Sequence, residues 1–186
     1  MKYLFAAIFI LSTITGCHGR ESPLTPALEL RKALLAAQTC SFQTVITADY
    51  GEDLYTFQMD CCADSTGKLT FTVLEPTSIA GITGSISKDK AALTFDGHVL
   101  AFPVLAEGDL SPVSAPWIFL NSLRGGYLSG CSEQADGFCL YLDDTFGADP
   151  LQLEIWTDTN CVPIGAEIIW HDRRILSIEI RNFQFQ

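Results

Sequence analysis

The sequence predicts an α+β fold dominated by one antiparallel sheet of about ten strands, curled or closed, with one helix before it and another inserted. Three observations predict this architecture. Apolar residues recur at spacings of three and four over residues 24–38, as in an amphipathic helix. From residue 41 onward apolar and polar residues alternate, as in strands that bury one face. A continuous apolar run within residues 111–123 interrupts this alternation.

The first helix is expected over residues 24–38. Thr25 is suited to cap it, and Pro26 is suited to the first helical position. The apolar stripe of this helix consists of Ala27, Leu30, Leu34 and Ala37, widened by Leu28 and Leu35. A stripe of this width must cover an apolar surface elsewhere in the molecule.

Alternation predicts strands throughout the rest of the chain. The segments with the clearest alternation are residues 53–62, 68–74, 138–142, 151–155, 162–170 and 175–185. Polar turns are expected around Gly51, at Asp96-Gly97, at residues 132–137 and at residues 171–174. Because each strand has one polar face, a parallel sheet covered on both sides is excluded. The single antiparallel sheet would have a concave apolar face with more area than one helix can fill.

The inserted segment begins with Pro112 and Pro116 and then places four large apolar residues in succession, Trp117 to Leu120. This pattern predicts a short helix buried on more than one side, at the open end of the curled sheet. Two interpretations remain open, a plain core helix and a movable lid over a cavity. Side chains chosen for size and face as the wall of such a cavity are Phe57, Met59, Phe71, Phe95 and Trp117. The same side chains would also suit a solid core.

Composition narrows the class of protein. The chain has 186 residues, which favours one domain. It contains 11 Lys+Arg against 22 Asp+Glu, a formal net charge of −11, which disfavours nucleic acid as a partner because phosphate binding needs a basic surface. Hydrophobic residues make up 48% of the chain, so intrinsic disorder is not expected.

The N-terminus has the pattern of an export signal. Lys2 precedes an uncharged run over residues 3–14, which is too short to span a membrane. The following Ile14-Thr15-Gly16-Cys17 resembles the bacterial lipobox, which implies cleavage before Cys17 and attachment of diacylglycerol to its sulfur. The alternative is an ordinary secretory peptide with an incidental cysteine. Acyl chains such as palmitate, two on one cysteine, would suffice for stable anchoring.

The lipobox implies three segments: a signal peptide at 1–16, a lipidated tether at 17–23 and a single domain at 24–186. The domain would lie on the extracytoplasmic face of the cell membrane, tethered through Cys17. His18 follows the cysteine, so the aspartate signal for inner-membrane retention is absent, and the outer membrane is expected if the host has one.

Acylation of Cys17 would leave six of the seven cysteines, an even number in an exported protein, which predicts disulfides. The expected pairs are Cys131–Cys139 across one hairpin, Cys40–Cys62 across another, and the remaining Cys61–Cys161. Free thiols are the alternative if the host is anaerobic. A metal site is disfavoured because Cys61 and Cys62 are adjacent and no histidine lies at a supporting spacing.

Motifs of catalysis are not recognised in the sequence. The Gly-x-Ser-x-Gly spacing of α/β-hydrolases does not occur, and within the domain expected over 24–186 no histidine neighbours a serine or cysteine along the chain. Carboxylates at Asp143, Asp144 and Asp149 surround an expected turn, but their spacing is not that of a calcium loop. We therefore expect a protein that is not an enzyme, with no metal and no cofactor.

The order of these parts resembles the bacterial lipoprotein-localisation-factor family, LolA and LolB. Residues 150–158, 161–168 and 178–183 are similar to its closing strands, with an acidic turn, a proline that opens the next strand and a final Asn182-Phe183 pair. Residues 73–76 followed by 79–82 are similar to its strand that leads through a proline into a turn. The resemblance implies an incomplete barrel whose helices cover an apolar cavity for acyl chains. The six further cysteines depart from that family.

Two functions follow as expectations. In the first, the lipoprotein binds a lipid or another hydrophobic ligand, such as an acyl chain, in the concave face of its sheet. In the second, a structural or interaction lipoprotein has a solid core and uses its acidic surface to dock a protein partner in the cell envelope. An enzyme has the least support, because no nucleophile, base or metal cluster is recognisable.

Overall fold

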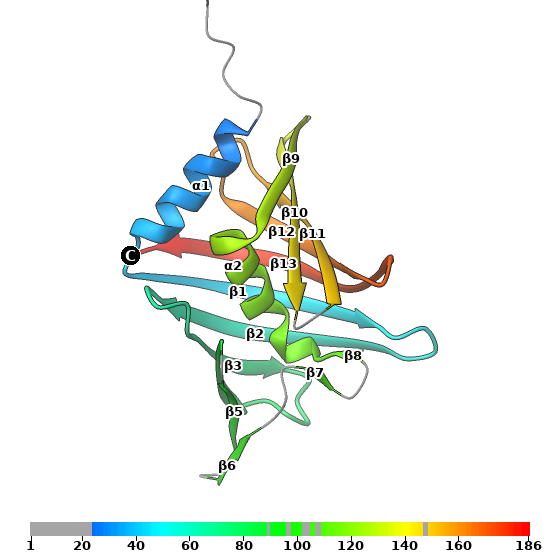
Figure 1. Ribbon diagram of the computed structural model, residues 1–186. Coiled ribbons are helices and arrows are strands. Elements are labelled where there is room, and N and C mark those ends of the chain that lie inside the picture. The colour runs from blue at the N-terminus through cyan, green and yellow to red at the C-terminus, as the bar shows by residue number, and fades with distance from the viewer. Residues whose placement is uncertain (1–23, 89, 96–97, 102–104, 107–108, 147–148) are drawn as a thin grey trace, which may run out of the picture.

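The computed structural model describes residues 24–88, 90–95, 98–101, 105–106, 109–146 and 149–186. In this part of the chain eleven strands form one antiparallel sheet, and two short strands pair separately. The sheet curls around two helices, α1 (Thr25–Ala36) and α2 (Ala115–Gly125) (Figure 1). The predicted mainly antiparallel α+β fold is confirmed. The sheet is open, because its two outermost strands do not pair with each other, and it forms an incomplete barrel.

Most of the strands are joined by short turns to their neighbours in the sheet. They are β1 (Thr39–Asp49), β2 (Leu54–Asp64), β3 (Leu69–Glu75), β4 (Thr83–Ser87), β5 (Lys90–Phe95), β6 (His98–Ala101), β9 (Tyr127–Gln134), β10 (Gly137–Phe146), β11 (Asp149–Thr157), β12 (Pro163–Trp170) and β13 (Arg173–Phe185). The separate pair is β7 (Leu105–Ala106) and β8 (Asp109–Leu110). The strands expected from alternation are all present, with their ends shifted by at most four residues.

In the middle of the sheet, the first and last strands of the domain lie side by side. The order of strands is β6-β5-β4-β3-β2-β1-β13-β12-β11-β10-β9, so the first strand pairs with the last. The backbone N–H groups of Gln38 and Thr39 both donate to the carbonyl of Gln186, at 2.9 and 3.0 Å. The chain end therefore lies beside the junction of α1 and β1, as Figure 1 shows.

The N-terminal helix begins differently from the expectation. Leu24 occupies the N-cap position without a side-chain capping hydrogen bond, and Thr25 is the first helical residue. Pro26 lies in the first turn, where a missing N–H costs nothing. Ala27, Leu30 and Leu34 of the predicted stripe are buried, whereas Leu28 and Leu35 are exposed. The buried stripe is therefore narrower than the sequence pattern suggested.

The hairpin turns are tighter than the sequence pattern suggested. The β12–β13 turn consists of His171 and Asp172, with φ of +49° and +59°, while the neighbouring arginines belong to β13. Two positive φ values at a two-residue turn match the right-handed twist of the flanking strands. The β5–β6 hairpin pairs Phe95 with His98, and the expected Asp96-Gly97 turn lies outside the described residues.

One contiguous apolar core fills the concave side. Side chains from α1, α2 and both halves of the sheet belong to a single buried cluster. The strands alternate buried and exposed residues, as β11 shows with Leu151, Leu153 and Ile155 facing the core. The convex face carries the intervening polar residues, which matches an antiparallel sheet with one solvated side.

Candidate functional site

The helix α2 lies across the concave face of the sheet (Figure 1). A single 3-10 turn, Pro112–Ser114, leads into it. Eight of its eleven residues are buried, including Phe119 and Leu123. The prediction of a short helix buried on several sides is confirmed. Continuous apolarity is the reason, because a helix without a polar face can form only where protein surrounds most of its circumference.

Hydrogen bonds from distant segments fix both ends of α2. At its C-terminal end, Arg31 of α1 donates from Nε to the carbonyl of Leu123 and from Nη2 to that of Gly126, at 2.8 and 2.7 Å. Burial lowers the pKa of Arg31 from its ordinary value, although the guanidinium remains charged at any physiological pH. Near the other end, Trp117 Nε1 donates to the carbonyl of Gly67 at 3.1 Å. These contacts hold α2 as a part of the core.

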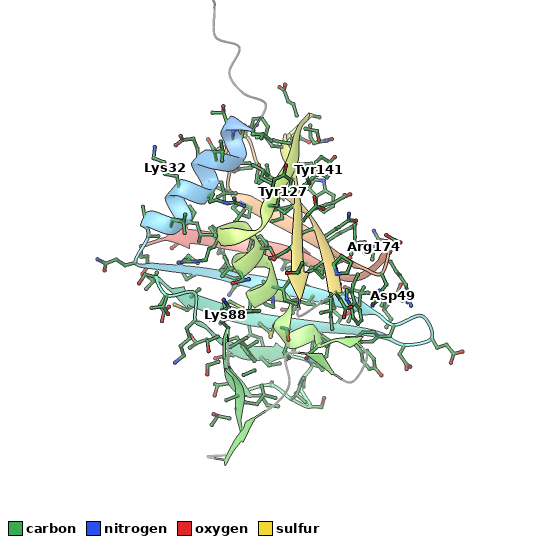
Figure 2. The ribbon with its side chains drawn as sticks, viewed as in Figure 1. Lys32, Asp49, Lys88, Tyr127, Tyr141 and Arg174 are labelled. Carbon is green, nitrogen blue, oxygen red and sulfur yellow. The ribbon has the colours of Figure 1, made fainter. Side chains whose placement is uncertain are left out.

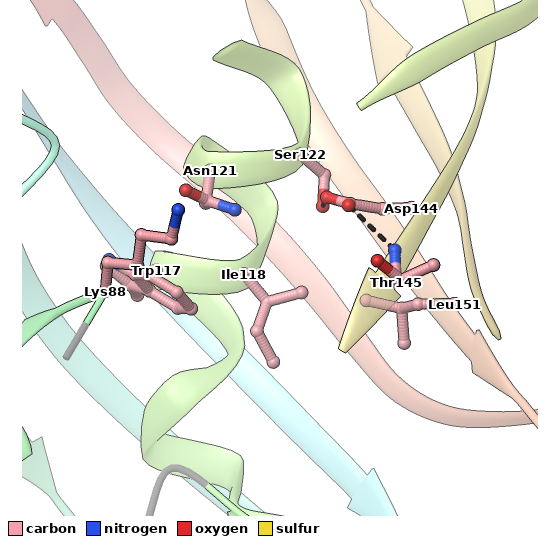
Figure 3. A pocket seen from close by; sticks show the side chains of 8 residues that line it. All are labelled: Lys88, Trp117, Ile118, Asn121, Ser122, Asp144, Thr145 and Leu151. Atoms are coloured by element: carbon pink, nitrogen blue, oxygen red, sulfur yellow. Dashed lines mark hydrogen bonds between the residues drawn. The ribbon is translucent and has the colours of Figure 1, made fainter. Parts of the chain in front are cut away.

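A cleft of about 410 Å³ opens between α2 and the β10–β11 hairpin. Four elements supply its eight lining residues, namely the β4–β5 turn, α2, β10 and β11. They are Lys88, Trp117, Ile118, Asn121, Ser122, Asp144, Thr145 and Leu151 (Figure 3). Cavities that hold small ligands in proteins have volumes of about 300–1,000 Å³, so this cleft falls within that range.

The floor of the cleft is apolar. Ile118 and Leu151 are each 1% exposed, and Trp117 is 7% exposed. Their positions follow from local structure, because Trp117 and Ile118 come from the uniformly apolar turn of α2 and Leu151 from the core face of β11. Of these three side chains Trp117 keeps the largest exposed fraction, so its indole offers most of the apolar surface that the floor leaves accessible to a ligand.

Polar groups occupy the walls of the cleft. Ser122, which is 1% exposed, donates from Oγ to Asp144 Oδ2 at 2.6 Å, and the backbone N–H of Thr145 donates to Asp144 Oδ1 at 2.8 Å. Both carboxylate oxygens of Asp144 are thus engaged. Lys88 and Asn121 are exposed, and neither makes an ion pair or side-chain hydrogen bond within the described part of the chain. The site combines an apolar floor with one charge of each sign.

The five residues that were expected to line a cavity do not lie together in the structure. Trp117 lines the cleft. Met59 and Phe71 are packed in the core, at 0% and 3% exposure, and Phe57 is half-buried. Phe95 belongs to β5, and its side chain lies outside the described residues. Apart from Trp117, the cleft is built from residues that the sequence did not single out as cavity wall.

The cleft residues that the sequence analysis did not identify have sequence patterns that give little indication of a binding site. Lys88 and Asn121 read as ordinary surface residues, since an isolated polar side chain has no periodic pattern. Asp144 was expected in a solvated turn, but β10 continues through Phe146. The carboxylate of Asp144 instead accepts a hydrogen bond from the buried hydroxyl of Ser122. A polar residue at a buried helix position, such as Ser122, is the one available sequence signal for such a partner.

The six described cysteines are free thiols, and none of the three expected disulfides is formed. Cys40 pairs with Ala63, so it points to the core face of the sheet, whereas Cys62 points to the other face. Similarly, Cys131 pairs with Leu140, which places it on the face opposite to Cys139. In both hairpins the register differs by one residue from the assumed one, and such a shift reverses every side chain.

Burial controls the chemistry of the thiols in β1 and β2. It raises the pKa of Cys40 to about 11, and it raises the pKa of Cys61 well above its ordinary value. Both thiols are therefore neutral at physiological pH and behave as small apolar core residues. Cys62 is exposed on the outer face of the same strand.

Several expectations fall on segments that the structure does not describe. Cys17 and the remainder of residues 1–23, over which the signal peptide and the lipidated tether are expected, lie outside the described residues. Within the described residues no helix is long and apolar enough to cross a membrane. In the same part of the chain no group of three or more His, Cys, Asp or Glu side chains is arranged to hold a metal ion.

Comparison with known proteins places the chain by its fold. No family model and no curated protein matches it. Among solved structures, a DUF1329 family protein from Desulfovibrio piger superposes with a TM-score of 0.50 at 11% identity, covering 89% of this chain and 94% of the other. A LolA superfamily protein from Nitrosomonas europaea gives 0.45 at 11% identity, with coverage of 86% and 93%. The lipoprotein LppX of Mycobacterium tuberculosis gives 0.39 at 13% identity, with coverage of 88% and 95%.

At identities of 11–13% these likenesses concern the fold alone. The structure has the architecture that the LolA resemblance implied, an open, curled antiparallel sheet whose concave face is covered by one N-terminal and one inserted helix. The expected architecture, an incomplete antiparallel barrel with two helices on its concave side, is therefore confirmed. Because one fold can serve several functions, the function must be argued from the cleft.

Proposed function

We propose that the protein is an extracytoplasmic lipoprotein that binds a lipid or another hydrophobic ligand in the cleft beside α2. The observation that carries this proposal is the apolar floor of Trp117, Ile118 and Leu151 in a cleft of about 410 Å³. Apolar surface at a cleft is the usual feature of small-ligand sites, because covering it removes hydrocarbon from water. The protein would act as a binder or carrier and not as an enzyme.

The anchor belongs to the same proposal. Residues 1–16 would be removed, Cys17 would carry two acyl chains, and residues 17–23 would connect them to the single domain over 24–186. With a net charge of −11, the chain would be repelled from an anionic membrane surface, so the lipid would be the principal membrane contact. The domain would lie on the outer face of the membrane, or at the outer membrane in a host with two.

Filling the cleft tests the ligand proposal. Asn121 is exposed on α2 and lines the cleft, so Asn121→Trp should occupy its volume without disturbing the core. We expect native mass spectrometry of the full-length protein to show a co-purified hydrophobic ligand on the wild type and at least a tenfold smaller liganded fraction for this variant, as for a loss of about 1.4 kcal/mol.

A matched control is available in the β9–β10 turn. Ala135 is exposed at the opposite end of β10 from Asp144, so Ala135→Trp adds the same side chain far from the cleft. We expect its liganded fraction to equal that of the wild type. A wild-type protein without any bound hydrophobic molecule, or equal occupancy in all three proteins, would contradict ligand binding in this cleft.

A second function is favoured by one specific observation. Most of the concave face is packed as solid core, as the complete burial of Met59 and Phe119 shows. This packing supports a structural lipoprotein whose acidic surface docks an envelope protein. The same mass measurement separates the two functions, because a structural protein would carry no ligand and would not respond to Asn121→Trp.

A further inference from the structure

We propose that the cleft selects amphiphiles with a single anionic head group, and that Lys88 is the residue that recognises this head. The inference rests on the proposed function, because it specifies the chemistry of the ligand in the same cleft. Lys88 would bind the oxyanion of a carboxylate or phosphate head, and Asn121 would donate from its amide. Trp117, Ile118 and Leu151 would contact the hydrocarbon chain.

The lining residues are arranged for a molecule with one polar end. Ile118 and Leu151 form the buried floor, whereas Lys88 and Asn121 are exposed at the rim. Figure 3 shows the Lys88 ammonium directed toward Asn121, with Trp117 beside its aliphatic chain. With its head group bound at this rim, the ligand would place its hydrocarbon chain over the apolar floor. The head group would then contact polar side chains and the chain would contact apolar ones.

Lys88 differs from most other cations of the described residues. Four of them form ion pairs with carboxylates, namely Lys32, Arg173, Arg174 and Arg181. Arg31 and Arg124 donate to backbone carbonyls. In a chain with twice as many acidic as basic residues, Lys88 has no carboxylate partner among the described residues. An ammonium at the rim of an apolar cleft, with no carboxylate partner in the described part of the chain, is suited to an anionic ligand.

The acidic residue of the cleft does not cancel this charge. Asp144 accepts hydrogen bonds from Ser122 Oγ and from the backbone of Thr145, so both of its oxygens are engaged. Figure 3 shows Lys88 and Asp144 on opposite sides of Ile118. The carboxylate of Asp144 therefore leaves Lys88 available, and it would repel a second anionic group placed at its end of the cleft. One anionic head is the consistent occupant.

The volume of the cleft limits the ligand further. About 410 Å³ is near the lower end of the range for small-ligand sites. A single-chain amphiphile suits this volume, whereas a lipid with three acyl chains does not. Fatty acids and single-chain lipid phosphates share the required chemistry, an oxyanion on one hydrocarbon chain.

The experiment compares charged and uncharged photoreactive probes on the full-length protein in lipid nanodiscs. The probes are a diazirine fatty acid, its methyl ester and a diazirine lysophosphatidic acid. Cross-linking to peptides of α2 and β10–β11 is quantified by mass spectrometry for the wild type and for Lys88→Ala, Lys88→Arg and Lys32→Ala. Lys32 lies on α1 away from Lys88 (Figure 2), so its variant makes the same change in net charge elsewhere.

We expect Lys88→Ala to lower the yield of at least one anionic probe about fivefold, as for the loss of one solvent-accessible ion pair. The yield of the ester should not change, and Lys88→Arg and Lys32→Ala should behave like the wild type. The anionic probe with the larger loss identifies the head group. High salt should reduce the difference, because it screens an exposed charge.

The failures of the two proposals are distinguishable. If the wild type cross-links the ester and the acids equally in these peptides, and Lys88→Ala changes none of them, head-group selection by Lys88 is wrong while ligand binding stands. An equal loss with Lys32→Ala would also overturn it, since net charge would then be the cause. If no probe reaches these peptides in the wild type, ligand binding in the cleft fails and the inference fails with it.

Discussion

Gly137 begins β10, and the C-terminal end of β11 approaches it closely there. Its φ is +151°, and a Cβ atom there would lie 1.9 Å from the carbonyl oxygen of Thr157. Backbone cannot move aside as a flexible side chain can, so this contact admits only glycine. The contact positions the start of the strand that supplies Asp144 and Thr145 to the cleft.

We predict that Gly137→Ala lowers the free energy of unfolding by more than the usual range of about 0.5–3 kcal/mol for single substitutions. Gly125→Ala is the matched control, because a Cβ atom there meets nothing within 4 Å. It should be neutral or stabilising by up to about 1 kcal/mol. Urea denaturation of both variants checks this, and equal midpoints would contradict the close approach at Gly137.

At the scale of elements, α1 and α2 form one unit through Arg31. The last carbonyls of a helix have no partner within the helix, and the guanidinium supplies donors to Leu123 and Gly126 from another helix. A cation at this end also interacts favourably with the helix dipole. The unit keeps α2 in place over the sheet, and its orientation decides that Trp117, Ile118 and Asn121 line the cleft.

We predict that Arg31→Met lowers the free energy of unfolding by about 1.5–3 kcal/mol, because methionine keeps most of the apolar stem and removes both donors. The control is Lys32→Met, whose ammonium is exposed and 3.4 Å from Glu29. We expect its effect to stay within about 0.5 kcal/mol. Thermal and urea denaturation measure both, and a Lys32→Met effect as large as that of Arg31→Met would refute the role given to Arg31.

At the scale of the whole molecule, the protein is an acidic domain that we propose to be tethered to the membrane through one acylated residue, Cys17. The prediction at this scale concerns the mature N-terminus. Intact mass spectrometry of the protein from its bacterial host should show a chain that starts at Cys17 and carries acyl groups. Cys17→Ser should retain residues 1–16 and lack those groups.

Cys62→Ser is the control for this measurement, because the thiol of Cys62 is exposed within the folded domain. The variant should be processed and acylated like the wild type. A mature wild-type chain that begins at any residue other than Cys17, or that carries no lipid, would remove the anchor from the proposed function.

Alternation and helical spacing were sufficient for the main elements. The stripe of Ala27, Leu30 and Leu34, the alternation of Leu151, Leu153 and Ile155, and the continuous apolarity around Phe119 each have one physical solution, because apolar side chains must share a buried face. These local patterns predicted an antiparallel sheet with one helix before it and one inside it, and the structure confirms that arrangement.

Only the tertiary structure determined the strand register and the set of residues that line the cleft. A shift of one residue at each hairpin placed Cys40 and Cys62 on opposite faces, and Cys131 and Cys139 likewise, because register depends on turn length and not on strand pattern. The cleft depends on contacts between segments far apart in the chain, which bring Lys88, α2 and the β10–β11 hairpin to one place. Polar side chains such as Lys88 have no period, so only the folded chain reveals where they meet.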